Sequence, residues 1–181
     1  MARRIAYTGE PVLTVQDVID WVRDDVARLE TKLIEHVIIP SVTSMCEAET
    51  GAAIRRATYV EDWAVGRSST QLDTGQAKTV ESVVLLQGGG VPLPAEQYSL
   101  QVGQRVSNLV LAAGVPKGPL RITYTAGLDL AAYPSVLSWL LLQAGTLFQQ
   151  RESLITGTIV AELPLKFIGS MLADIEVPPR F

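Results

Sequence analysis

The residues that could do chemistry in this 181-residue chain are few and far apart. His36 is the single histidine and Cys46 the single cysteine. Ten residues of one expected helix separate them, nearly three turns, so the imidazole cannot reach the thiol as a general base. No further Cys or His completes a metal-binding set. We therefore expect structural roles: His36 at the surface or core edge, and Cys46 as a small buried apolar residue.

Glycines and paired carboxylates offer no better case for catalysis. Residues 88–90 are three glycines followed by Val-Pro-Leu-Pro, whereas a phosphate-binding loop continues with Lys and Ser or Thr into a helix. We expect a hairpin tip there. The pairs Asp24–Asp25 and Glu61–Asp62 are adjacent, so their side chains point apart, and we interpret them as solvated charges. The sequence therefore predicts no catalytic, cofactor or metal site, and a chain that is not an enzyme.

The composition is typical of a folded protein with a sizeable core. Hydrophobic residues make up 48% of the chain and charged residues 19%, and the formal net charge is −4. An acidic balance disfavours a general nucleic-acid coat. The most apolar run, 136–148, is too short to span a bilayer, and the N-terminal arginines have no apolar run behind them. We expect a soluble chain in a reducing compartment, without membrane contact.

Apolar residues at helical spacing predict helices at both ends of the chain. Thr14 and Asp17 resemble a capping box at the start of a first helix, and a second helix runs from about residue 26 to 49 with a kink or restart at Pro40. A third, over 136–152, is apolar on nearly every side, and a short fourth covers 163–175. In the second helix the residues expected to face the core are Leu29, Leu33 and Val37.

Between the helices the apolar period changes to two, which indicates strands. These are expected at 53–65, 78–87, 97–102, 107–113 and 120–126. In the last of them Leu120, Ile122 and Tyr124 should share the covered face.

The predicted fold is therefore α+β, a small helical bundle of two N-terminal and two C-terminal helices with an inserted antiparallel β-sheet or small barrel. We expect a single domain over 1–181. Its parts are a helical core at about 12–51 and 133–176, a β-rich insertion at about 52–128 and an extended tail at 177–181.

The order of these elements resembles the head–tail connector (adaptor) family of tailed bacteriophages, in its larger form with a β-rich insertion. The stretches similar to that family are Thr14–Asp25 in the first helix, ETG at 49–51, RITYTAGL at 121–128 with Pro134 behind it, Gln150–Glu152, and the Leu-Pro at 163–164 that opens the last helix. Their order and spacing carry the resemblance, because each stretch is short.

The resemblance implies a structural protein of the virion neck, at the head–tail interface, made in the host bacterial cytoplasm. Members form a homo-oligomeric ring, usually dodecameric, that docks on the portal protein. They join the portal to a neck stopper or tail-completion protein. DNA passes through the lumen without sequence-specific binding, and no cofactor is implied.

Two candidate contact regions follow from this reading. A proline-stiffened tail loses little entropy on binding, which suits a portal-docking arm. Its residues are Ile175, Glu176, Val177, Pro178, Pro179, Arg180 and Phe181. A helix that is apolar on all sides is easier to explain if neighbouring subunits cover part of it. The candidate subunit-interface residues on that helix are Trp139, Leu140, Leu142 and Phe148.

The alternative reading is a small binding module whose β insertion recognises a glycan or a nucleic acid. A cluster of aromatic residues lining a pocket would favour it. The residues that could contribute to such a cluster are Tyr59, Trp63, Tyr98 and Tyr124.

Overall fold

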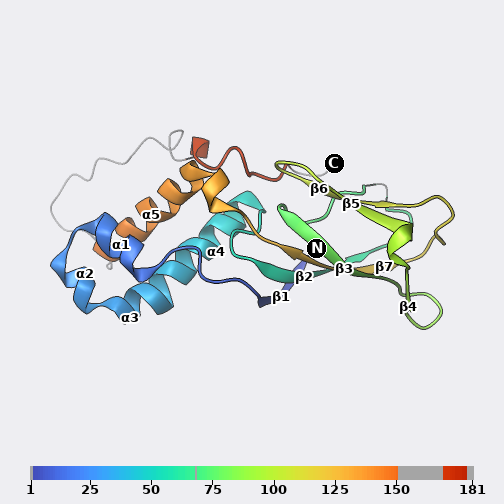
Figure 1. Ribbon diagram of the computed structural model, residues 1–181, viewed down its shortest axis with the longest axis horizontal. Helices are drawn as coiled ribbons and strands as arrows, with labels where there is room; N and C mark the ends of the chain where they lie inside the picture. Colours follow the sequence, from blue (N-terminus) through green and yellow to red (C-terminus); the bar gives the residue numbers. More distant parts are fainter. Residues whose placement is uncertain (1, 68, 151–168, 179–181) are drawn as a thin grey trace. The chain divides into compact units, whose positions relative to one another are not determined.

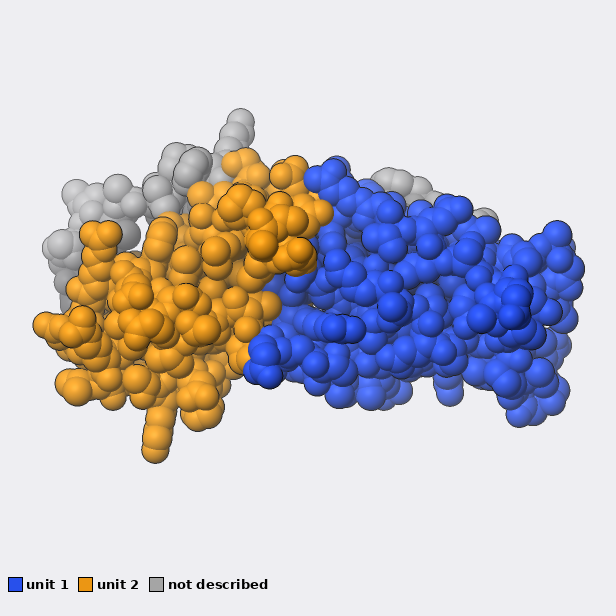
Figure 2. Space-filling view, viewed as in Figure 1, with its two compact units in different colours: residues 1–10, 50–128, 175–181 blue, residues 11–49, 129–174 orange. Residues whose placement is uncertain are grey.

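The computed structural model describes residues 2–67, 69–150 and 169–178 (Figure 1). The chain divides into two compact units, coloured separately in Figure 2. The β unit comprises residues 1–10, 50–128 and 175–181, and the helical unit comprises residues 11–49 and 129–174. One unit built on antiparallel strands and one built on helices make an α+β fold, which confirms the predicted class.

The β unit is an open five-stranded antiparallel sheet with a separate two-stranded hairpin. In the sheet the order is β1 (Arg3–Tyr7), β2 (Ala57–Trp63), β7 (Leu120–Ala126), β3 (Ala77–Leu85) and β4 (Val91–Pro92). The hairpin pairs β5 (Tyr98–Val102), which follows the single turn η2 (Ala95–Gln97), with β6 (Ser107–Leu111). The described strands form no closed barrel, so an open sheet is the correct one of the two predicted arrangements.

The core of the β unit lies on one face of β2 and β7. These strands pair along their whole length, from Ala57 opposite Ala126 to Trp63 opposite Leu120. The alternation predicted for β7 is confirmed, because Leu120, Ile122 and Tyr124 are all buried. Thr125 is buried as well, and its hydroxyl lies 2.6 Å from that of Thr79 on β3.

Two short strands at the sheet edges were not predicted. Most of β1 is exposed, so it has no alternation of apolar and polar residues to read. It is held by pairing with β2. The guanidinium groups of Arg4 and Arg55 lie 4.2 and 4.5 Å from the centre of the Tyr7 ring. At the other edge β4 returns beside β3 after the three glycines, whose positive φ values make the predicted hairpin tip.

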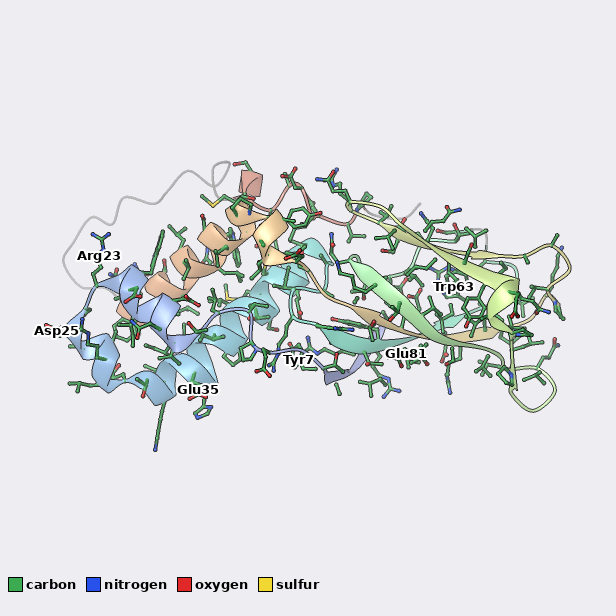
Figure 3. All side chains as sticks on the ribbon, viewed as in Figure 1. Tyr7, Arg23, Asp25, Glu35, Trp63 and Glu81 are labelled. Atoms are coloured by element: carbon green, nitrogen blue, oxygen red, sulfur yellow. The ribbon has the colours of Figure 1, made fainter. Side chains whose placement is uncertain are left out.

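The helical unit starts with the predicted capping box. The amide of Asp17 donates to Thr14 Oγ1 at 3.1 Å, and the amide of Thr14 donates to Asp17 Oδ2 at 2.7 Å. The first helix ends at Arg23, whose φ is 54°, and Asp24 then caps the next helix (Figure 3). The helices are α1 (Val15–Val22), α2 (Asp25–Leu29), α3 (Thr31–Leu33), the π-helix η1 (Ile34–Ile38), α4 (Ile39–Thr50), the single turn η3 (Leu130–Ala132) and α5 (Pro134–Gln149).

Pro40 produces a π turn and no restart. The helix continues from Thr31 to Thr50, and the irregularity lies in η1, directly before the proline. There the amide of Ile39 donates to the carbonyl of Ile34, five residues back. A proline cannot donate a helical hydrogen bond, and its ring crowds the carbonyl four residues earlier. The wider π turn accommodates both effects.

The prediction of which residues face the core is wrong for the second predicted helix. Leu29 is 85% exposed, Val37 is 52% exposed and Leu33 is half-buried. The segment breaks at Glu30 and widens in η1, so its rotation departs from a single regular helix. The apolar residues that it buries are Ala27, Ile34, Ile38, Ile39, Val42 and Cys46.

The C-terminal helices are partly described. α5 begins at Pro134, two residues before the predicted start, with the proline in its first turn. Of the predicted helix at 163–175, residues 163–168 lie outside the described residues, 169–170 are helical and 171–175 form turns. No helix in the described part of the chain is long and apolar enough to cross a membrane.

Candidate functional site

Cys46 and His36, the two residues with the most reactive side chains, lie in different chemical environments. Burial, with Glu49 and Glu47 nearby, raises the pKa of the Cys46 thiol to about 12, so the thiol stays neutral at physiological pH. His36 is exposed, with Nε2 3.9 Å from the carboxylate of Glu35. Both positions agree with the predicted structural roles. Among the described residues no group of three His, Cys, Asp or Glu side chains could hold a metal ion.

Glu61 is the chain's one fully buried carboxylate among the described residues, and its prediction as a solvated charge is wrong. It lies on the inner face of β2 with Tyr59 and Trp63, because alternate residues of a strand share a face. Its neighbour Asp62 points outward and accepts a hydrogen bond of 2.8 Å from Arg121, which lowers the pKa of Asp62. Only the outer member of the pair is solvated.

Hydrogen bonds hold both oxygens of the Glu61 carboxylate. Trp63 Nε1 and Arg67 Nη1 donate to Oε1 at 2.7 and 2.9 Å, and the amide of Asp73 donates to Oε2 at 2.8 Å. Arg67 also lies 4.5 Å over the Trp63 ring and donates to the carbonyl of Gln71 at 2.7 Å. Burial raises the pKa of Glu61. A carboxylate so engaged anchors the loop that follows β2 and is poorly placed to act as a general base.

The pocket nearest this anchor does not gather the predicted aromatic residues. Its volume is about 450 Å³, and Trp63 is the only aromatic residue among the described residues that line it. Tyr59 and Tyr124 are buried in the sheet core, with ring centroids 5.8 Å apart. Tyr98, on β5, is half-buried and does not line the pocket. No specific observation therefore favours the alternative of a binding module.

The first part of the candidate docking tail is bound to the β unit. Ile175 is buried, and the carbonyl of Glu176 accepts a hydrogen bond of 3.0 Å from Arg105 Nε. The amide of Val177 donates to the carbonyl of Thr50 at 2.7 Å. Its side chain fills space that exists because position 75 is glycine: a Cβ there would lie 2.7 Å from Val177 Cγ2. These contacts make residues 175–177 an intramolecular strap.

The end of the tail remains a candidate for docking. Pro178 is exposed, and Pro179, Arg180 and Phe181 lie outside the described residues. Docking by these four residues stays a prediction.

The candidate subunit-interface helix contributes mostly to the interior of its own chain. In α5, Trp139, Leu140 and Phe148 are buried and Leu142 is half-buried. Only Leu142 of the four offers surface to a neighbouring subunit, and its place in an interface stays a prediction.

Sequence reasoning missed an exposed groove on the helical unit. The groove has a volume of about 560 Å³. Its lining residues come from η1 and α4 and are His36, Val37, Pro40, Ser41, Ser44, Met45 and Ala48. Of Leu29, Leu33 and Val37, which the sequence assigned to the core, only Val37 lines the groove.

Comparison with solved structures finds chains with this fold. The chain matches one in the neck of an empty gene transfer agent (GTA) particle computed with C6 symmetry, with a TM-score of 0.74 and 15% identity. It matches a chain in the virion of the native particle with a TM-score of 0.72 and 15% identity. It also matches a chain in the neck of the native particle, computed with C12 symmetry, with a TM-score of 0.63 and 14% identity. Each match covers 100% of this chain and 97% of the other.

Sequence comparisons add nothing to these matches: no family model matches the chain, and no curated protein matches it significantly. The structural similarity is full-length and shows that the chain has the fold of virion neck chains. This agrees with the connector fold that the sequence resemblance implied.

Proposed function

We propose that this chain is a structural protein of a virion neck, a ring-forming head–tail connector. It docks on the portal protein and joins it to the next neck or tail-completion protein, and DNA passes through the lumen. The observation that carries the proposal is the full-length similarity to chains from virion necks that were computed with sixfold and twelvefold symmetry. A cyclic assembly of identical chains is what such symmetry describes.

The distribution of charge supports passage of DNA without capture. The helical unit contains twelve aspartate and glutamate residues against five lysine and arginine residues, whereas the β unit contains seven against ten. Tight nucleic-acid binding depends on many cationic contacts that release counterions from the phosphates. The helical unit lacks that charge balance, so it can lie near DNA without retaining it.

The position of the strap supports the tail as a portal-docking arm. Residues 175–177 are fixed on the β unit, so the tail leaves a defined point at Pro178. Two consecutive prolines stiffen its first part and reduce the entropy lost on binding. Arg180 and Phe181 supply a cation and an aromatic ring, two residue types enriched in interfaces.

Deleting residues 179–181 is expected to weaken portal binding at least about tenfold, a loss of about 1.4 kcal/mol, and to leave the fold intact. The deletion spares Val177 and therefore the strap. Co-sedimentation with purified portal protein measures binding, and circular dichroism checks the fold.

Two controls separate the arm from the function as a whole. Replacing Glu96, exposed on η2, with alanine should leave portal binding unchanged. Wild-type affinity in the truncated chain would contradict the docking arm alone. Failure of the full-length chain to bind portal would contradict the connector proposal itself.

A further inference from the structure

The groove on α4 presents apolar surface with little cover. Val37 is 52% exposed and Met45 is 44% exposed, and Pro40 lies between them in sequence. The other lining residues include the small side chains of Ser41 and Ala48, which let another chain approach the helix backbone closely. Soluble proteins rarely leave apolar patches open unless a partner covers them.

The absence of charge distinguishes this groove from the rest of the helical unit. None of its described lining residues is Asp, Glu, Lys or Arg, although the unit contains seventeen such residues. Depletion of charged residues and enrichment in Met are features of the centres of protein–protein interfaces. An acidic unit also repels nucleic acid, so a protein surface is the occupant that the chemistry favours.

We propose that the groove is filled by a second copy of this chain, in an inference that rests on the proposed ring. The two faces of a cyclic contact differ, so the groove needs a complementary apolar surface elsewhere on the chain. Trp21 on α1 supplies it. Its side chain is 47% exposed, and Val26, at the start of α2, is 46% exposed.

The position of Trp21 suits it as an anchor. It packs against α5, where a Cβ added at Gly145 would lie 3.3 Å from the indole ring. The ring is therefore held on one side while its remaining surface is open. Tryptophan is among the residue types that contribute most binding energy in interfaces. Trp21 of one copy thus enters the α4 groove of the next, and repetition of this contact closes the ring.

Charge substitutions in the groove test this contact. Val37→Glu and Met45→Glu should each reduce the ring population at least about tenfold at a concentration where the wild-type chain assembles, because an unpaired carboxylate would be buried. Val102→Glu on β5 is the matched control, since Val102 is 57% exposed and lies outside the helical unit. Light scattering measures assembly, and circular dichroism checks that each variant folds.

Cysteine cross-linking tests which surfaces meet. The double variant Val26→Cys with Ser44→Cys, which keeps Trp21, should form a ladder of disulfide-linked copies on mild oxidation. The native Cys46 is buried and does not compete. Neither single variant should form the ladder. Dimers from Ser44→Cys alone would show that the groove meets itself and would overturn the pairing.

The outcomes separate this inference from the function on which it rests. Rings that persist in Val37→Glu and Met45→Glu overturn the groove contact and leave the connector proposal standing. Intact rings that lose only portal binding overturn it too, because the groove would then face the portal. A wild-type chain that stays monomeric with and without portal overturns both proposals.

Discussion

Replacing Glu61 with alanine is expected to lower the free energy of unfolding by about 3–5 kcal/mol. The substitution leaves buried donors from Trp63, Arg67 and Asp73 without their acceptor. The guanidinium of Arg67 also loses an ion pair whose partner is fully buried. Arg67 keeps its longer contact with Asp73, at 3.4 Å, so most of the cost comes from buried donors that lose their acceptor. Urea unfolding followed by circular dichroism measures the change.

Glu81 provides the matched control for this substitution. It lies on β3 in the same sheet and is exposed (Figure 3). Glu81→Ala should change the free energy of unfolding by less than about 0.5 kcal/mol, as is usual for surface substitutions. Similar losses for the two variants would show that Glu61 does not anchor the loop after β2.

The second large effect is expected at Gly127, where replacement by alanine should cost roughly 1–3 kcal/mol or more. A Cβ there would lie 2.7 Å from Arg56 Cα and 2.9 Å from Arg56 Cβ. The clash is with backbone and cannot be relieved by turning a side chain. Four chain segments meet at this point. The amides of Thr8 and Gly9 donate to the carbonyl of Arg56 at 2.9 and 3.0 Å, and the amide of Gly127 donates to the carbonyl of Gln76 at 3.0 Å.

Gly169 is the control glycine, because a Cβ added there meets no atom within 4 Å. Gly169→Ala should be neutral or slightly stabilising, since alanine favours the helical conformation of that residue. Thermal unfolding of both variants measures the difference. Equal melting temperatures for the two would contradict the close approach of Gly127 to Arg56.

The close approach gives a physical reason for part of the family resemblance. The segment RITYTAGL, at 121–128, ends where β7 leaves the sheet, and only a residue without a side chain fits against Arg56. In this chain the glycine of that segment is therefore required by packing.

Features that depend on local sequence could be predicted, and features that depend on distant partners could not. The strand β7 and the cap at Thr14 follow from alternation and from a four-residue motif. By the same alternation Glu61 belongs on the inner face with Tyr59 and Trp63. Its main partners, however, lie in a loop whose path is set by the tertiary fold. The exposed β1 has no pattern of its own and forms because β2 offers a free edge.

The error in the second helix has a different cause. Two apolar stripes run along residues 26–50, and sequence periodicity cannot say which one faces the core. The break at Glu30 and the π turn in η1 decide it, and the π turn depends on the proline that follows it. The stripe that was assigned to the core, with Leu29 and Val37, is the exposed one. Val37, which lines the groove now proposed for contact between copies, was thus assigned to the core.

The most direct test of the connector proposal is the copy number of the purified chain, alone and mixed with purified portal protein. Native mass spectrometry or electron microscopy of the particles gives this number. The proposal predicts closed rings, with twelve copies when portal is present, as in a neck of twelvefold symmetry. A chain that remains monomeric in both samples, at concentrations well above those of assembly, would contradict it.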